Sequence, residues 1–400
     1  ASEGVLTRLY AKALALEDGK GTRVVILTTD LIGLPRSITD AVSARAMKEY
    51  GLERARLLFN SSHTHTGPVV RPNLISMYDL NEAEDARLKV YARKLTEDLF
   101  AIIGAALGKL APARLEFGQS TAGFAINRRE FTPAGVKLGL APKGPVDHSV
   151  PVLAVRGEDG SFKAVLFGYA CHNTTLSHYM ISADYAGYAQ TAIEKEHPGA
   201  QAMFLLLCGG DQNPNPRRTD ELAEQHGKAL AAGVEQVLAL AQREPVRAPI
   251  KAAYQVTNLR FAVHTREQFE KEAKDSNVHK ARRARQMLAL YDERRETRST
   301  PYPVQAIRFH KDLTILALGG EVVVDYALRA KKENPKERLV VAGYSNDVMC
   351  YIPSLRVLKE GGYEANDSMI YYGMPGPFSE DVEETVFLAI RSVLKRVGVK

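Results

Sequence analysis

Apolar runs that predict buried strands recur along the chain, and turn residues or helical periodicity separate them. The strand runs lie at residues 11–16, 23–27, 57–59, 152–155, 164–169, 202–207, 250–263, 313–318 and 339–342. Helical spacing and capping signals predict helices at residues 37–51, 81–110, 183–197, 219–243 and 379–396. This alternation predicts an α/β fold, with a large mixed β-sheet core flanked by helices.

Local signals define some of the predicted helices. Ser37 and Asp40 stand at capping-box spacing where the first helix begins, and Gly51 stands at its C-terminal end. Thr219 is a candidate N-cap for the long helix that follows it. Residues 265–300 carry charges of both signs in a helical pattern, so we expect a solvated helical arm or lid there.

Two histidines, His63 and His65, follow the apolar run at 57–59 and precede a Gly-Pro turn signal. At positions i and i+2 they would share one face of an extended backbone, where both imidazoles can converge on one point. On a helix they would lie roughly 200° apart. Taken alone, the pair fits a surface strand end as well as it fits a metal site.

Polar residues that could take part in catalysis or ligand binding follow six of the apolar strands. Ligands in α/β folds bind in the crevice outside the carboxyl ends of the strands, so six such ends indicate one shared active site. Helices that begin near the site would add N-terminal dipoles favouring anionic groups. The six residues are Asp30, His63, His172, Asp211, Glu321 and Asn346.

His63, His172 and Glu321 would together form a His₂Glu set. Three protein ligands with an open fourth position are typical of catalytic zinc, which lowers the pKa of bound water to about 7. Each residue also has a simpler interpretation. His172 follows an aromatic-rich strand and could be a core histidine, while Glu321 could be only a carboxylate near a helix N-terminus.

Composition narrows the class of protein. Of the residues, 45% are hydrophobic and 25% are charged, as in soluble globular proteins. The net charge of +6 is a small excess of 53 cations over 47 anions, so we expect no nucleic-acid partner. The three cysteines, Cys171, Cys208 and Cys350, lack CxxC spacing, which argues against a disulfide framework or zinc ribbon.

The sequence gives little support to three other classes, namely serine hydrolases, dinucleotide-binding proteins and membrane-spanning proteins. There is no G-x-S-x-G elbow for a serine hydrolase and no G-x-G-x-x-G turn for a dinucleotide fold. The sequence has no run of 18 apolar residues for a membrane span and no cleavable signal at its start.

Several separated motifs, in order, resemble the neutral/alkaline (non-lysosomal) ceramidase family. The resemblance implies a single ceramidase-like catalytic domain over residues 1–400, with neither the family's C-terminal immunoglobulin-like domain nor its short glycine-rich opening segment. The motifs are the segment 62–68, Ile126-Asn127-Arg128, His172, the segment 182–188, Gly210-Asp211-x-x-Pro214-Asn215, Gly320-Glu321 and Gly343-Tyr344-Ser345-Asn346.

The resemblance implies roles for individual residues. A Zn²⁺ ion would be bound by His63, His172, Glu321 and Tyr351. Tyr363 would polarise the scissile carbonyl, His65 would help to stabilise the oxyanion, and Arg128 would orient a polar substrate group. The implied reaction is hydrolysis of an N-acyl amide bond by a metal-activated water. The complete catalytic set is His65, Arg128, Asp211, Asn213 and Tyr363.

Two positions depart from the family pattern. Asn213 stands where the family has an active-site serine, and an amide cannot act as a nucleophile. Asp30 matches a residue of a second divalent-cation site, whose other ligands come from the domain absent here, so we expect that site to be absent or altered. The alternatives are a metal-dependent hydrolase or lyase acting on a sugar derivative or lactone, and a non-catalytic binding homologue. The resemblance also implies a small or lipid-like substrate, peripheral membrane contact, and a secreted or periplasmic location.

Overall fold

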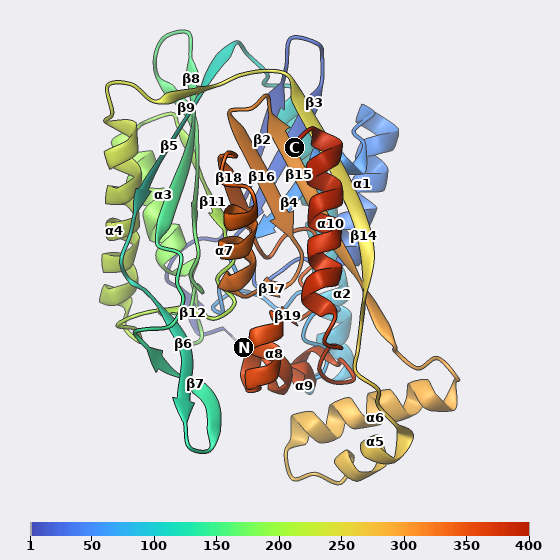
Figure 1. The fold of residues 1–400 in the computed structure, drawn as a ribbon. Coiled ribbons are helices and arrows are strands. Elements are labelled where there is room, and N and C mark those ends of the chain that lie inside the picture. The colour runs from blue at the N-terminus through green and yellow to red at the C-terminus, as the bar shows by residue number, and fades with distance from the viewer. Residues whose placement is uncertain (1, 400) are drawn as a thin grey trace.

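The computed structural model describes residues 2–399 and confirms an α/β fold with several multistranded sheets flanked by helices. The first sheet pairs β2 with β3 antiparallel and β3 with β4 parallel. Two helices, α1 and α2, pack on its outer face (Figure 1). The bounds are β2 Ala11–Glu17, β3 Arg23–Thr29, β4 Leu57–Ser61, α1 Arg36–Tyr50 and α2 Glu82–Leu107.

A second, five-stranded sheet has the strand order β11-β9-β8-β5-β13, and α3 and α4 cover its outer face. Strand β9 runs parallel to β11, so both strands end at the same edge. The bounds are β5 Ala113–Thr121, β8 Ser149–Gly157, β9 Phe162–Tyr169, α3 Asp184–Glu196, β11 Gln201–Leu206, α4 Asp220–Leu238 and β13 Glu244–Val246.

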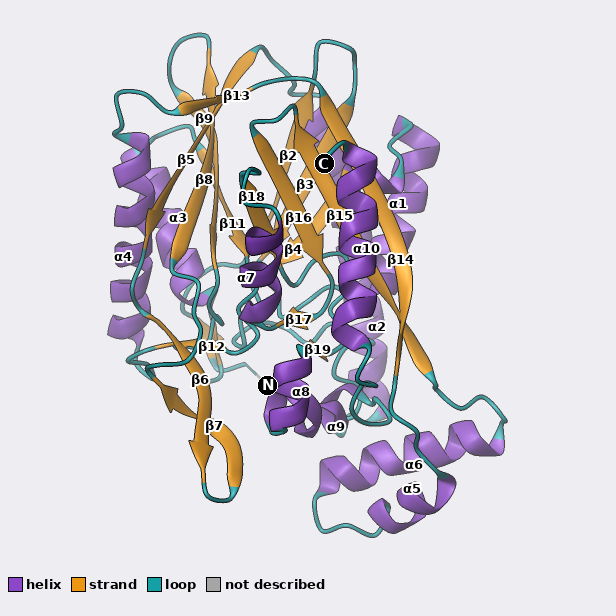
Figure 2. Cartoon of the chain, viewed as in Figure 1, coloured by secondary structure: helices purple, strands orange, loops and turns teal. Residues whose placement is uncertain are grey.

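The third sheet has the order β14-β15-β16-β18, with β16 parallel to β18. Helices α7 and α10 lie against its outer face, so helices surround the sheets in Figure 2. The bounds are β14 Ile250–Arg260, β15 Ser299–Phe309, β16 Leu313–Leu318, α7 Val324–Glu333, β18 Leu339–Ala342 and α10 Val382–Val397.

All three sheets contribute to one inner core. In β3, Val24 and Ile26 face this core, whereas Val25 and Leu27 face the helices α1 and α2. The same alternation recurs in β9, β11 and β16. Because both faces of these strands are buried, they read in the sequence as continuous apolar runs.

Short elements gather at the carboxyl ends of the central strands, in the lower half of Figure 1. One small sheet has the order β12-β6-β7, and β17 pairs in parallel with β19. The bounds are β1 Gly4–Val5, β6 Ala125–Thr132, β7 Gly135–Ala141, β10 Met180–Ile181, β12 Gln212–Pro214, β17 Glu321–Val322, β19 Tyr351–Ile352, α8 Leu355–Glu360, the π-helical turn η2 Tyr363–Asp367 and α9 Met369–Tyr372. A 3₁₀ turn, η1, precedes β4 at Arg54–Arg56.

The charged segment forms two helices, α5 Arg266–Glu272 and α6 Val278–Asp292, which project as an arm from this same end (Figure 1). Gln286 of α6 accepts a hydrogen bond from Ser76 Oγ (2.6 Å), and Arg282 donates to the Ser76 carbonyl (2.8 Å). Within residues 2–399, no helix has both the length and the apolar character that crossing a bilayer requires.

Some local predictions are confirmed and others are wrong. Gly51 ends α1 in the left-handed region (φ 64°) and Thr219 caps α4. Ser37 is not the cap of α1, because Pro35 occupies that position. The long strand β15 escaped prediction, since two prolines, Pro301 and Pro303, argue against a strand in sequence.

The buried side-chain amide of Asn60, in β4, joins all three sheets. Its Nδ2 donates to the Gly343 carbonyl beyond β18 (2.8 Å) and to the Leu206 carbonyl of β11 (3.2 Å). Its Oδ1 accepts from the Leu206 backbone N–H (2.8 Å). Since β4 ends at Ser61, this junction lies immediately before His63.

We predict that Asn60→Ala lowers the free energy of unfolding by about 3 kcal/mol or more, because each unpaired buried polar group costs about 1–3 kcal/mol. Urea titration monitored by circular dichroism measures the change. The matched control is Asn258→Ala at an exposed position of β14, which should change stability by less than about 0.5 kcal/mol. Equal stability of the two variants would contradict the role of Asn60.

Candidate metal centre and active site

His63 occupies a turn immediately after β4 rather than an extended strand. Its φ is 62°, a conformation that non-glycine residues rarely adopt outside functional sites. The extended-backbone argument for the histidine pair is therefore wrong. The two imidazoles nevertheless meet, with 3.1 Å between Nε2 of His63 and Nε2 of His65. The His63 backbone N–H donates to the Leu31 carbonyl beyond β3, which fixes the turn (2.9 Å).

His172 lies beyond the end of β9 and is completely buried. Its backbone N–H donates to the Gln212 carbonyl of β12 (2.9 Å). Its Nδ1 lies 2.8 Å from the Gly209 carbonyl oxygen. A side chain at Gly209 would meet the Cys171 backbone nitrogen at 2.7 Å, so only glycine permits this approach.

Glu321 brings its carboxylate between these two imidazoles from β17. Its Oε2 lies 3.0 Å from Nε2 of His63 and 3.1 Å from Nε2 of His172. Tyr344 donates to the same oxygen (3.3 Å), and Tyr372 donates to Oε1. The predicted His₂Glu residues, which lie far apart in the sequence, therefore meet at one point.

The hydrogen bonds at the far side of each imidazole show that this cluster suits a cation. A carbonyl oxygen only accepts, so Nδ1 of His63 donates to Ile32 and Nδ1 of His172 donates to Gly209. In the neutral rings, both Nε2 atoms then carry lone pairs. These lone pairs and the Glu321 carboxylate converge, which is the arrangement that metal ligands and their supporting carbonyls adopt.

His65 offers a further ligand atom at the same place. One ring nitrogen each of His63, His65 and His172 lies within 4.8 Å of the others. A metal could therefore be held by these three imidazoles, or by His63, His172 and Glu321. The two sets share His63 and His172, and they differ in whether His65 or the carboxylate completes them.

The surroundings keep His172 and His65 neutral, as metal binding requires. Burial and then the nearby Arg128 charge lower the pKa of His172 to about 4. The His65 side chain retains exposed surface, yet the protein around it and the imidazoles of His63 and His172 lower its pKa well below the usual value.

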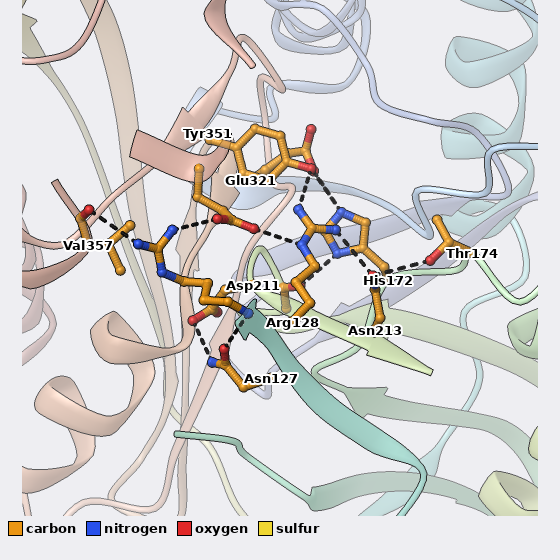
Figure 3. A network of polar contacts seen from close by, with 12 residues as sticks. Asn127, Arg128, His172, Thr174, Asp211, Asn213, Glu321, Tyr351 and Val357 are labelled. Carbon is orange, nitrogen blue, oxygen red and sulfur yellow. Dashed lines mark hydrogen bonds and ion pairs between the residues drawn. The ribbon is translucent and has the colours of Figure 1, made fainter. Parts of the chain in front are cut away.

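Tyr351 and Arg128 extend the cluster (Figure 3). Tyr351 lies beside Glu321 because β17 and β19 pair in register. Its Oη donates to Nε2 of His172 (3.0 Å) and accepts from Nη2 of Arg128 (3.0 Å). The neighbouring Tyr351 and Glu364 raise the pKa of Arg128 well above its usual value, although burial acts in the opposite direction.

Glu364 fixes the orientation of Arg128. Its Oε1 accepts from Nε of Arg128 (2.8 Å), and its Oε2 accepts from Nη1 of Arg129 (2.6 Å). Burial would raise the pKa of Glu364, but the two guanidinium groups hold it below its usual value. Arg128 therefore keeps its charge and a fixed geometry inside the protein.

Asn213 and Tyr363 lie next to Arg128 from opposite parts of the chain. Asn213 Oδ1 accepts from Nη1 of Arg128 (3.1 Å) and from Thr174 Oγ1 (3.4 Å). The Tyr363 ring lies 5.4 Å from the Tyr351 ring, and the Arg128 guanidinium carbon lies 5.6 Å from its centroid.

The other three strand-end residues do not join the cluster. Asp211 accepts from the Val324 backbone N–H at the start of α7 (2.8 Å) and from Asn127 (3.0 Å), so it supports the fold around the site (Figure 3). Asp30 accepts from the Tyr10 backbone N–H (2.9 Å). Asn346 accepts from the Phe59 backbone N–H (3.3 Å). The helix N-terminus near the site is that of α7, whose Val324 N–H donates to Asp211, so the helix dipole acts on Asp211.

A small pocket opens beside His65. Its lining is mixed, with the polar residues Thr64, His65 and Asn73 beside a group of apolar side chains. The apolar side chains are Ile32, Pro68, Val69, Val70, Leu74 and Tyr78.

Sequence reasoning missed three residues that contact the predicted site. Tyr344 lies in the motif Gly343-Tyr344-Ser345-Asn346, but the motif did not imply a role for it. Tyr372 and Glu364 lie outside all of the motifs. Tyr344 follows β18, and Tyr372 is the last residue of α9. The one signal in the sequence was the position of Tyr344, which follows an apolar strand two residues before Asn346. No signal in the sequence indicated Tyr372 or Glu364.

Comparisons with known proteins agree with this architecture. Two solved structures match nearly the whole chain, each at 18% sequence identity. The neutral ceramidase from Pseudomonas aeruginosa has a TM-score of 0.71, with 98% of this chain and 70% of that chain covered. A structure described as ceramidase complexed with C2 has a TM-score of 0.73, with 99% and 71% covered. At this identity the likeness shows the fold alone.

Curated relatives match in sequence. The neutral ceramidases of Drosophila melanogaster and Drosophila pseudoobscura pseudoobscura are each 22% identical over 234 residues. The match covers 53% of this chain and 32% of each relative, so it spans about a third of the curated proteins.

A family profile described as "Neutral/alkaline non-lysosomal ceramidase, N-terminal" matches residues 1–215. This segment contains His63, His65, Arg128, His172 and Asn213, and it is more than half of the chain. The resemblance found in the sequence motifs is thereby confirmed: the protein belongs to the neutral/alkaline non-lysosomal ceramidase family.

Proposed function

We propose that the protein is a zinc-dependent hydrolase that cleaves an N-acyl amide bond, in a ceramide-like substrate or a related N-acyl amine. The observation that carries the proposal is the convergence of His63, His172 and Glu321, with both histidines held in the tautomer that presents Nε2. Family membership supports the class of reaction.

His63 and His172 would hold the zinc in either donor set, with Glu321 or His65 beside them and Tyr351 within reach. Bound zinc would supply an activated water nucleophile near neutral pH and polarise the scissile carbonyl. The carbonyl contacts of Ile32 and Gly209 keep the imidazoles aimed at that point.

The remaining residues provide charge and orientation around the scissile bond. The lowered pKa of His65 keeps its imidazole neutral at pH 7, so the ring donates one N–H and accepts at the other nitrogen. Such a donor beside the site would stabilise the developing oxyanion, together with the Tyr363 hydroxyl. Arg128, held by Glu364, would orient a polar group of the substrate.

Apolar side chains beside His65, among them Ile32, Val70 and Leu74, would contact the apolar part of the substrate. A second candidate function is favoured by Asn213, which replaces the family serine and contributes, with Arg128 and Thr174, a polar wall. This candidate is a metal-dependent hydrolase or lyase acting on a polar substrate such as a sugar derivative or lactone.

Metal analysis tests the proposed centre. We predict about one zinc per chain in the purified protein and loss of most of it in His172→Ala, because His172 belongs to both donor sets. Loss in Glu321→Ala with retention in His65→Ala would select the carboxylate set, and the reverse result would select the three imidazoles. The control is His197→Ala, which removes a histidine paired with Glu235 elsewhere. Full zinc in His172→Ala would refute the centre.

Substrate assays test the reaction. We predict amine release from N-acyl sphingosine-type substrates, abolished by a zinc chelator and restored by added zinc, because the nucleophile depends on the metal. Mass spectrometry of products after incubation with a panel of amides, lactones and sugar derivatives gives the measurement. Product only from lactones or sugar derivatives would establish the second candidate. Bound zinc without turnover of any compound would indicate that the protein is a non-catalytic binding homologue.

The role of Asn213 is tested separately. We predict that Asn213→Ala lowers kcat/KM by about tenfold to a hundredfold, the loss expected from one hydrogen bond to a charged group. Asn213→Ser should fall in the same range, because a serine there would not be the nucleophile. Loss of about a millionfold in Asn213→Ala, as for removal of a catalytic nucleophile, would contradict this mechanism.

A further inference from the structure

Two tyrosines outside the proposed ligand and catalytic sets hold the carboxylate of Glu321. We propose that Tyr372 and Tyr344 are positioning residues that orient Glu321 toward the bound metal, with Tyr372 the more important of the two. This inference rests on the metal centre proposed above and deepens it.

The two phenols reach Glu321 from separate elements. Tyr372 is the last residue of α9, and its Oη donates to Oε1 of Glu321. Tyr344 follows β18, and its Oη donates to Oε2 at 3.3 Å. Both side chains are buried, with 9% and 1% of their surface exposed, so water does not readily replace either donor.

The two hydrogen bonds give the two carboxylate oxygens of Glu321 different surroundings. Within residues 2–399, Tyr372 is the sole hydrogen-bond partner of Oε1. Oε2 faces Nε2 of both His63 and His172. Fixing Oε1 therefore leaves Oε2 as the oxygen that is presented to a metal. A carboxylate without this donor would lose both its orientation and part of the stabilisation of its charge.

Tyr344 supports the centre in a second way. Its ring centroid lies 4.7 Å from that of His63 and 6.0 Å from that of His172, so it packs against both imidazoles. A phenylalanine at this position would keep that packing and lose only a long hydrogen bond. The effect of removing the Tyr344 hydroxyl should therefore be smaller than the effect of removing the Tyr372 hydroxyl.

The arm stabilises the segment that presents Tyr372. Arg283 of α6 donates to the carbonyls of Met374 (2.9 Å) and Pro375 (2.6 Å), immediately after α9. The ring of His279 lies 5.1 Å from that of Tyr371. Because α9 is only four residues long, these contacts supply rigidity that the helix itself does not provide.

The test measures zinc affinity by competition with a chromophoric chelator. We expect Tyr372→Phe to raise the zinc dissociation constant by about tenfold to a hundredfold, the usual effect of losing a partner of a metal ligand. Saturating zinc should still give one ion per chain. Tyr344→Phe should show a smaller rise. The matched control is Tyr326→Phe, which removes a buried phenol that donates to the Pro353 backbone carbonyl (3.0 Å) rather than to the Glu321 carboxylate.

A spectroscopic readout separates positioning from a general loss of stability. With cobalt in place of zinc, Tyr372→Phe should change the visible d–d absorption of the ion, whereas Tyr326→Phe should leave that absorption as in the original protein. Unchanged zinc affinity in Tyr372→Phe, or an equal loss in Tyr326→Phe, would overturn the inference. Absence of zinc from the original protein would instead overturn the metal centre itself, and the inference with it.

Discussion

The side-chain amide of Asn60 is the junction on which the geometry of the candidate site depends. Three sheets must end at the same place for the residues that follow β4, β9 and β16 to meet. Asn60 holds β4 to β11 and to the loop after β18 by hydrogen bonds that no other side chain in β4 makes. Because these bonds are buried, their loss would leave backbone groups of Leu206 and Gly343 without the Asn60 side chain as a partner inside the protein.

Around this junction the protein buries an unusual amount of charge. The Glu321 carboxylate is stabilised by phenol donors and faces two imidazoles, an arrangement that a bound cation would complete. Beside it, Glu364 pairs with both Arg128 and Arg129, and Glu360 forms a second ion pair with Arg129. Burying an unpaired charge costs free energy, so loss of one partner would destabilise the buried charge with which it pairs. The site therefore depends on a connected set of residues rather than on its ligands alone.

Asn213 contributes to the site through Arg128, the arginine that lies against Tyr351 and Tyr363. Its side-chain oxygen accepts from Arg128 and Thr174. The chain matches about a third of the curated ceramidases in sequence but about 70% of the solved bacterial chain in structure. The fold thus persists where sequence identity is low, because the packing of strands tolerates many apolar substitutions.

The sequence alone determined many strands of the core, although not β15, because strands buried on both faces require apolar residues at nearly every position, as in 23–27 and 313–318. It also indicated His63, His172 and Glu321, because polar groups at strand ends are conspicuous after apolar runs. It could not show that only three of the six strand ends meet. That outcome depends on turns such as the φ of 62° at His63 and on the pairing of β17 with β19. Tyr372 and Glu364 reach the site through contacts between residues distant in sequence, which only the tertiary structure brings together.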